Sequence, residues 1–495
     1  MSGGFGRTLG HTLVYMAGLV VNRGVAFLLV PVFTRVFTPG EFSVWDLCNT
    51  TLLLLFPMLD IGMSSAVVRF YHDYDDRGRR AAAFNTSLIF VALAHVPVVA
   101  AGFIAAPWLS RAIFGVPDHA ALVRLVFLMA SATAIGKQSL SMLRTAERSA
   151  LFAALNLVRG LTGPLIIIVL VTGLGWGVAG ALWGDLIGLA VLAAAGMWVC
   201  RGWLRPVFDR AVLGEMLRFA LPLVPMGLTT ALLTIADRYF LSHLLDLDQM
   251  APYSLGFRVG MLMVLFIQGF QLAWPPAALR MAADPAQGAA ALARTGFLMQ
   301  ATLFGAAACI TCATPELLLV FAPRQGYDTA NLIVPLIAYS YAIHGAMLVV
   351  NVGIGIAKRN LWGALATACS CAVKLAVTYW FIVRWGIAGA ALSTLLAFTV
   401  ELGLTYAFTQ WIVYPLPHDK RRLLGLYAAS AAVLLLGMAA MRLPHAASIA
   451  PRALLLAAFA GLAWRVLLSG EDRRGVLRAA AGLAVKARGK LRDRA

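Results

Sequence analysis

Residues 88–108 read LIFVALAHVPVVAAGFIAAPW, an apolar run without an acidic residue, a lysine or an arginine. A helix of about 20 apolar residues spans the ~30 Å hydrocarbon core of a bilayer. In lipid, only helices and closed barrels satisfy their backbone hydrogen bonds, and barrel strands show short segments of alternating polarity. Residues 88–108 do not alternate, so they predict a transmembrane helix. This run decides the fold class because similar runs recur along the chain.

The composition extends the same interpretation to the whole chain. Of its 495 residues, 61% are hydrophobic and 13% charged, whereas soluble domains carry about 25% charged residues. We therefore expect an all-α integral membrane protein with about fourteen transmembrane helices. Their expected ranges are residues 10–36, 42–68, 82–107, 120–143, 149–172, 177–200, 215–243, 250–275, 293–320, 331–355, 361–383, 386–411, 423–441 and 452–468.

The loop charges predict the topology. The net charge of +18 would suggest nucleic acid in a soluble protein, but here the basic residues alternate between loops and orient the chain, so no nucleic-acid partner is expected. Both termini are predicted to be cytoplasmic, in a bacterial inner membrane. Cytoplasmic loops then hold Arg77, Arg79, Arg80, Arg144, Arg148, Arg201, Arg205, Arg210, Arg280, Arg294, Lys358, Arg359, Lys420, Arg421 and Arg422, and the opposite side holds mainly Arg111, Arg324, Arg384, Arg442 and Arg452.

The sequence repeats itself at an offset of about 208 residues. TRVFTPGEFSVWDL at 34–47 aligns with SHLLDLDQMAPYSL at 242–255, and WGVAGALWGDL at 176–186 aligns with WGIAGAALSTL at 385–395. An even number of helices in each copy predicts two halves related by an axis along the membrane normal, with a pathway between them. The expected parts are a six-helix bundle at 1–205, a second at 206–415, two additional helices at 416–470 and a basic cytoplasmic tail at 471–495.

Charged residues inside the apolar runs are the candidate functional residues. A charge at the bilayer centre costs about 2.5–3.5 kcal/mol on insertion scales, so these side chains are expected to face a watered cavity or one another. The predicted cavity residues are Asn22, Arg23, Asp60, Arg159, Arg238, Arg258, Gln268 and Gln271. The predicted coupling or ion-pair residues are Asp185, Asp237, Lys374 and Glu401.

Structural roles stay open for several of these residues. Asp237 and Arg238 are adjacent and could lock helix packing through partners on other helices. Lys374 and Glu401 could form one ion pair. Arg238 and Arg258 could reach the interface if the helix boundaries differ, and the two glutamines could join helices instead of binding cargo.

The charge types indicate an anionic cargo. Arginine offers a planar fork of donors that matches phosphate oxygens, which suits a polyprenyl-diphosphate-linked oligosaccharide. No cofactor, metal or catalytic residue is expected, because all loops are short and no Walker motif is present. Cys309 and Cys312 have metal or redox spacing, but no second pair accompanies them.

The chain resembles the polysaccharide flippase branch of the multidrug/oligosaccharidyl-lipid/polysaccharide exporter superfamily. In the first half the resemblance rests on FLLVPVFTRVFTPGEFSVWDL and LDIGMSSAVVRFYHD. In the second half it rests on FALPLVPMGLTTALLTIADRYFL, APYSLGFRVG and PELLLVFAPRQGYDTANLIVPLIAYSYAIHG. It implies two six-helix bundles in a V around a central cavity, with the two additional helices forming a groove for the lipid tail.

The resemblance also implies a function and a site. It implies export of undecaprenyl-diphosphate-linked repeat units to the periplasmic leaflet, with Arg23, Asp60 and Arg258 lining a cationic cavity. Membrane lipids are expected partners, as are the polymerase and glycosyltransferases of the same pathway. Two alternatives remain: a multidrug antiporter of the same superfamily, which would take cationic cargo, and a membrane-embedded polymerase or ligase, which the short loops disfavour.

Overall fold

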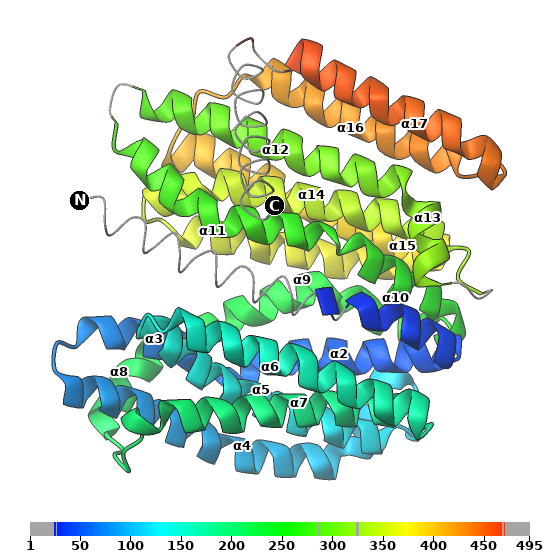
Figure 1. Cartoon of the computed structure of the whole chain (residues 1–495). Helices are drawn as coiled ribbons and strands as arrows, with labels where there is room; N and C mark the ends of the chain where they lie inside the picture. The colour runs from blue at the N-terminus through cyan, green and yellow to red at the C-terminus, as the bar shows by residue number, and fades with distance from the viewer. Residues whose placement is uncertain (1–23, 26, 285–286, 323–325, 468–469, 471–495) are drawn as a thin grey trace, which may run out of the picture.

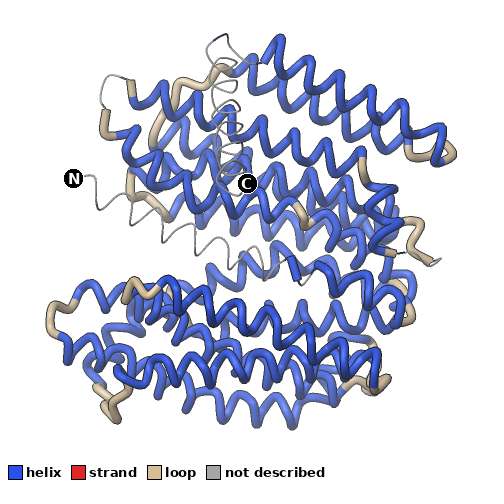
Figure 2. The backbone as a smooth tube through the Cα atoms, viewed as in Figure 1, coloured by secondary structure: helices blue, strands red, loops and turns tan. Residues whose placement is uncertain are grey.

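The computed structural model describes the whole chain except residues 1–23, 26, 285–286, 323–325, 468–469 and 471–495 (Figure 1). The described part is helical, with short loops and no strand (Figure 2). The first half contains α2 (Pro39–Asp60), α3 (Met63–Asp73), α4 (Arg77–Phe114), α5 (Ala120–Thr145), α6 (Ser149–Ile168) and α7 (Gly177–Val199). The second contains α8 (Arg210–Ala220), α9 (Leu223–Leu244), α10 (Leu247–Gly260), α11 (Met263–Ala282), α12 (Gly288–Cys312), α13 (Thr314–Phe321), α14 (Ala330–Ile356) and α15 (Leu361–Phe408), followed by α16 (Lys420–Ala440) and α17 (His445–Leu462).

The predicted all-α membrane architecture is confirmed. Among the described residues, 12 segments are long and apolar enough to cross a membrane. One of them, Leu361–Val413 with 53 residues, leaves helical geometry at Gly386 (φ 56°, ψ −137°), so it supplies the two crossings expected at 361–383 and 386–411. The first expected helix, 10–36, lies mainly outside the described residues, which include its apolar end Phe27–Val36. The N- and C-terminal tails predicted to be cytoplasmic also lie outside the described part.

Several expected helices are broken in the structure. The segment predicted at 42–68 divides into α2 and α3 because Ile61 and Gly62 both adopt left-handed backbone conformations (φ 49° and 69°). The segments predicted at 215–243 and 250–275 are also interrupted, at Leu221–Pro222 and at Met261–Leu262, but the backbone of these residues stays in the right-handed region. Proline in a helix interior removes a backbone hydrogen bond, which explains the break at Pro222.

Helix boundaries recur with the spacing of the sequence repeat. The helix α2 begins at Pro39 and α10 begins at Leu247, 208 residues later. Similarly, α4 ends at Phe114 and α13 ends at Phe321, and α5 and α14 begin at Ala120 and Ala330. The proposed limits of the two bundles, at 205/206 and 415/416, stay a prediction.

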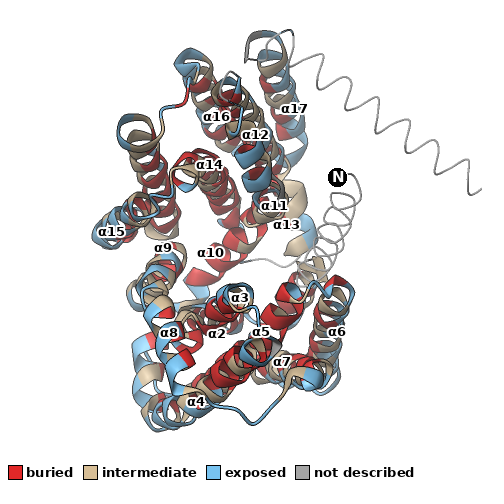
Figure 3. Ribbon diagram, turned by 90° about the vertical axis from the view of Figure 1, so that its left-hand side faces the viewer, coloured by how far each residue is buried: buried red, intermediate tan, exposed pale blue. Residues whose placement is uncertain are grey.

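The two groups of helices meet at α2, α9 and α10. In Figure 1, α2 to α7 lie below, α11 to α17 lie above, and α9 and α10 run between them. The helix α2 packs against α9 and α10, and the buried Phe42, Trp45, Tyr253 and Phe257 join them in one apolar cluster. The last two helices, α16 and α17, pack on α12. Seen from the end, α10 and α14 are the most deeply buried helices (Figure 3).

The start of α2 is fixed locally. Thr38 caps the helix and forms a capping box with Glu41, and Pro39 occupies the first helical turn. A cap of this kind typically contributes about 1 kcal/mol, and proline is compatible with the first turn because its missing N–H has no helical partner there. The cap sets the rotation of the turns that follow, which carry Trp45 and Asp46 towards α9 and α10.

Candidate functional site

A buried cluster of charges lies where the two halves meet. The Arg238 Nε atom of α9 lies 2.8 Å from one Asp46 oxygen, and the Arg258 Nη2 atom of α10 lies 2.6 Å from the other. The Asp46 and Arg238 side chains are 3% and 5% exposed, whereas Arg258 is 24% exposed. Two arginines therefore share one carboxylate at the contact between α2, α9 and α10, and Arg238 Nη1 also lies 3.8 Å from Asp237.

Aromatic rings orient these guanidinium groups. The Arg258 guanidinium lies 4.0 Å from the centre of the Trp45 ring, and that of Arg238 lies 3.9 Å from the centre of the Phe257 ring. Arginine over an aromatic face is attracted by the ring quadrupole, more strongly when water is excluded. The rings and the shared carboxylate together hold both arginines in place.

A second ion pair lies next to this cluster and is closed to solvent. Lys374 of α15 lies 3.6 Å from Asp237, and both side chains are fully buried. The lysine also donates to the Leu233 carbonyl, while Tyr253 and Thr394 donate to the Asp237 carboxylate. Asp237 of α9 thus links its helix to α10 and α15, which is the packing role that the sequence left open for it.

The third group of charges lines a cavity of about 190 Å³. Arg159 of α6, Asp185 of α7 and Arg258 of α10 lie in its wall together with Trp45 and Asn49 of α2. Three residues that the sequence singled out separately therefore come together at one site. With two arginines and one aspartate, the charged side chains of this wall sum to +1, which suits an anion.

Glycines bring α6 and α7 close enough to form this wall. A Cβ atom added at Gly188 would lie 2.8 Å from the Gly163 Cα atom, and one at Gly184 would lie 2.5 Å from Ile167. Small residues in membrane helices allow this close backbone approach. Because both helices contribute to the cavity, the glycine ridge positions Arg159 and Asp185 at one site.

Asp60 lies at the other end of α2, apart from the cavity lined by Arg159 and Arg258, which we call the arginine cavity. Its carboxylate is 4% exposed and accepts a hydrogen bond from Ser64 of α3. His95 and Lys137 interact electrostatically with it, and the lysine ammonium lies 4.0 Å from the centre of the Phe56 ring. The structure therefore places Asp60 in a buried polar cluster of the first half.

Lys374 and Glu401, which the sequence suggested as one ion pair, have different partners in the structure. Lys374 pairs with Asp237, whereas Glu401 lies 3.2 Å from His344 Nδ1 and accepts a hydrogen bond from Thr367 at 2.8 Å. A pair between Lys374 and Glu401 is therefore wrong. Their relative rotation on the two arms of α15 directs them to different neighbours.

The remaining predicted residues are placed as follows. Gln271 of α11 lines a separate cavity, between α11, α12 and α14, and Gln268 is half buried on the same helix. Asn22 and Arg23 lie outside the described residues. Among the described residues, no group of three or more His, Cys, Asp or Glu side chains could hold a metal ion.

Sequence reasoning missed four partners in these clusters. Asp46 is the central one, because both Arg238 and Arg258 depend on it. A signal was present, since Asp46 is an acidic residue inside the expected helix 42–68. Lys137, His95 and His344 were also overlooked; the two histidines escaped a search for fixed charges because a histidine with its usual pKa of about 6.5 is mostly neutral at pH 7.

One ion pair attaches the last two helices to Glu316, a residue of α13 that lies outside the membrane spans. Arg452 of α17 binds both Glu316 oxygens, at 2.7 and 2.8 Å, and donates to the Cys312 carbonyl. The hydrogen bonds from Arg452 hold the pKa of Glu316 below its usual value of 4.5. The residue is therefore a carboxylate at neutral pH and keeps α13 tied to α17.

Known proteins share the sequence pattern and the fold. A profile described as polysaccharide biosynthesis protein matches residues 9–281. The chain is 26% identical over 249 residues to the lipid III flippases of Escherichia coli (strain K12) and Shigella flexneri. That alignment covers 48% of this chain and 59% of each relative.

Solved structures extend the fold comparison to nearly the whole chain. The lipid II flippase MurJ in an inward closed conformation superposes with a TM-score of 0.73 at 14% identity, covering 92% of this chain and all of that one. An inward-facing multidrug resistance MATE transporter of the MOP superfamily superposes with a TM-score of 0.61 at 14% identity, covering 84% of this chain and 99% of that one. At these identities the comparison shows a shared fold.

Proposed function

Since the chain belongs to the polysaccharide biosynthesis protein family, we propose that it is a flippase for lipid-linked oligosaccharides. Its cargo is an undecaprenyl-diphosphate-linked repeat unit, moved from the cytoplasmic to the periplasmic leaflet of a bacterial inner membrane for surface polysaccharide synthesis. The similarity to proteins named lipid III flippase supports this transport role over a catalytic one. Partners on this proposal are the lipid-linked cargo, membrane lipids and the polymerase and glycosyltransferases of the pathway.

The arginine cavity is the observation that carries the proposal. Arg159 and Arg258 reach one cavity wall from opposite halves of the molecule, so an anion bound there contacts both halves at once. Guanidinium groups bind phosphate oxygens through paired donors, and their strength increases in a wall shielded from water. A diphosphate bound between them would displace Asp185 and Asp46 as the partners of these arginines.

On this proposal, the charge cluster around Asp46 controls the alternation between the inward-facing and outward-facing states. It joins α2 to α9 and α10 near the helix ends that the loop charges place on the periplasmic side. When a diphosphate competes for Arg258, one of the two links from Asp46 is lost. The halves can then separate at that end, which is the change that opens a pathway to the periplasm.

The choice between flippase and multidrug antiporter depends on the charge of the cargo. The fold is shared with both classes. A lipophilic cation is repelled by two arginines, whereas a diphosphate is attracted. The positive wall therefore favours the flippase.

Replacement of Arg159 tests the proposal in cells. Arg159 has no hydrogen bond to another described residue and interacts electrostatically with Asp185, so Arg159→Gln removes a charge from the cavity without breaking a hydrogen bond. We expect surface polysaccharide to fall at least about tenfold, the effect of losing one charge-assisted contact of about 1.5 kcal/mol or more. The matched control is Arg69→Gln, which removes an exposed arginine of the i,i+4 pair with Asp73. Normal polysaccharide in a well-expressed Arg159→Gln strain would contradict the proposal.

A further inference from the structure

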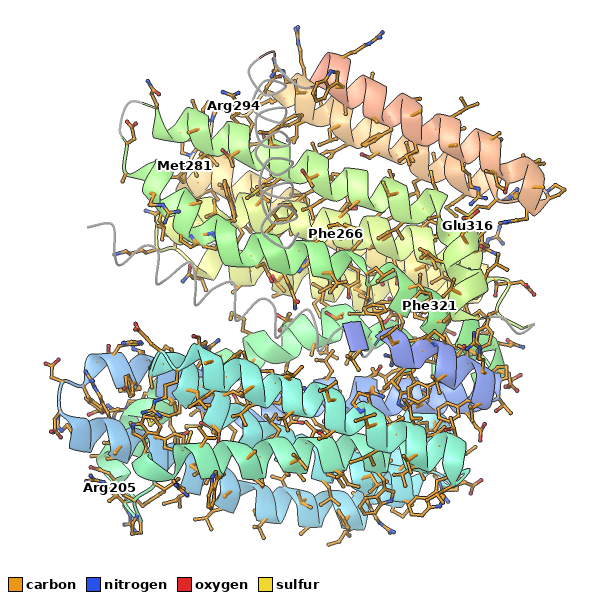
Figure 4. The ribbon with its side chains drawn as sticks, viewed as in Figure 1. Arg205, Phe266, Met281, Arg294, Glu316 and Phe321 are labelled. Carbon is orange, nitrogen blue, oxygen red and sulfur yellow. The ribbon has the colours of Figure 1, made fainter. Side chains whose placement is uncertain are left out.

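A second cavity, of about 410 Å³, lies within the second half of the molecule. Its walls come from α11, α12 and α14, and Figure 4 labels Phe266 and Met281 on α11. None of the described residues that line it carries a charge. It therefore differs in chemistry from the arginine cavity, and the transport of a diphosphate leaves it without a role.

The sequence repeat shows how this cavity arises. In the first half, the ionisable residues Asp60, His95 and Lys137 interact electrostatically, with Asp60 and His95 buried and Lys137 exposed. The positions 208 residues later are Gln268, Leu303 and Gly345. Replacement of a lysine by a glycine removes the largest of these side chains, and Gly345 and Leu303 both lie in the cavity wall. The first half thus carries ionisable side chains at positions where the second half carries uncharged ones.

Two side-chain amides in the wall are available to a ligand. Gln271 is exposed in the cavity and has no hydrogen bond to another described residue. Asn351 of α14 also lines the cavity, although its side-chain oxygen is buried beside Gly363 of α15 and accepts no hydrogen bond within the described part of the chain. Each amide offers both donors and an acceptor, as adjacent sugar hydroxyls require.

Aromatic rings complete the wall. Phe270 is partly exposed, and Trp274 is fixed because its indole nitrogen donates to the Val349 carbonyl of α14 at 3.2 Å. A pocket with mostly apolar and aromatic walls and a few placed polar groups is typical of small-ligand sites. Pyranose rings present both an apolar C–H face and hydroxyl edges.

We infer that this cavity is a sugar subsite, which binds uncharged residues of the oligosaccharide while the diphosphate occupies the arginine cavity. The inference rests on the proposed function. Arg258 and Gln271 lie on the same membrane-crossing segment, Leu247–Ala282. At about 1.5 Å per residue they are on the order of 20 Å apart along it, so an oligosaccharide, unlike a single sugar, reaches both. The second half then binds the sugars, and the wall of the arginine cavity, to which both halves contribute, binds the diphosphate.

Binding of two synthetic lipids to the full-length protein in nanodiscs tests this division. One probe is undecaprenyl diphosphate that carries a neutral trisaccharide, and the other is undecaprenyl diphosphate without sugar. We expect Gln271→Ala and Asn351→Ala each to raise the Kd of the trisaccharide lipid about five- to tenfold, as the loss of one or two hydrogen bonds predicts. The Kd of the sugar-free lipid should stay unchanged, whereas Arg159→Gln should weaken both lipids.

A variant that fills the cavity tests whether its open volume is needed for binding, independently of the two amide side chains. Gly355 lines the cavity, and a Cβ atom there would meet no atom within 4 Å, so Gly355→Leu fills space without displacing a neighbour. Gly403 of α15 is also in open space but lies outside the cavity wall, which makes Gly403→Leu the matched control. We expect Gly355→Leu to weaken the trisaccharide lipid alone and Gly403→Leu to weaken neither.

The alternative outcomes separate the two hypotheses. If the wild-type protein binds the two lipids with the same Kd, the proposed function survives and the sugar subsite is refuted. If Gly355→Leu weakens both lipids and the amide variants have no effect, the cavity holds the polyprenyl chain, which also overturns the inference. If the wild-type protein binds neither lipid, the proposed function fails and the subsite fails with it.

Discussion

Replacement of Asp46 by asparagine should weaken the contact between the two halves more than any exposed charge change. The substitution keeps the side-chain volume but leaves Arg238, which is 5% exposed, and the more exposed Arg258 without their shared carboxylate. Removing one partner of a buried ion pair typically costs about 3–5 kcal/mol. Arg238 retains Asp237 at 3.8 Å, so we expect the lower end of that range, about 3 kcal/mol.

Reversible unfolding in mixed detergent micelles measures this free energy. The matched control is Asp73→Asn, because Asp73 pairs with Arg69 at 3.3 Å while both side chains are about half exposed. Exposed pairs contribute about 0–1 kcal/mol. Adding Arg238→Gln to Asp46→Asn should restore part of the lost stability, since it removes a buried charge that has lost its nearest carboxylate. Equal losses for Asp46→Asn and Asp73→Asn, or a double variant whose losses simply add, would refute the buried-cluster account.

Three further predictions follow from the same contacts. Because the pKa of Glu316 is lowered in the folded protein, the unfolded chain takes up this proton first as the pH falls. The stability that the Arg452–Glu316 pair contributes is therefore present above pH ~4.5 and lost below it. Acid should therefore make the wild-type protein easier to unfold, whereas the stability of Glu316→Gln should depend less on pH. Gly188→Val should separate α6 from α7 and cost about 1–3 kcal/mol by overpacking, measured in the same micelle assay, and an unchanged stability would contradict the close approach seen there. Lys374→Met and Glu401→Gln should have additive effects within about 0.5 kcal/mol in a double-mutant cycle, because the two residues belong to separate clusters; a larger coupling would reinstate a direct pair between them.

The fold was predictable because its determinants are local and repeated. Apolar runs of sufficient length predict crossings without knowledge of their neighbours, and the offset of about 208 residues predicts paired helices. The breaks were harder to predict. Ile61 adopts a left-handed backbone that a β-branched residue rarely shows, and the only local sign was the following Gly62.

The candidate site was predictable in its residue types but not in its pairings. Arg159, Asp185 and Arg258 could be singled out as intramembrane charges, and the structure brings them to one cavity wall. Which charges meet depends on how each helix is rotated, which a single sequence does not specify. Lys374 therefore binds Asp237 rather than Glu401, and Asp46 acquires its central role through contacts with residues about two hundred positions away.

Translocation in reconstituted vesicles tests the arginine cavity most directly. A fluorescent undecaprenyl diphosphate that carries an oligosaccharide is placed in one leaflet, and its appearance in the other is followed with wild type, Arg159→Gln and Gly403→Leu. The account predicts rapid transfer by wild type and Gly403→Leu, and transfer slowed at least about tenfold by Arg159→Gln. Equal transfer by all three proteins would contradict a mechanism in which arginines from the two halves hold the diphosphate.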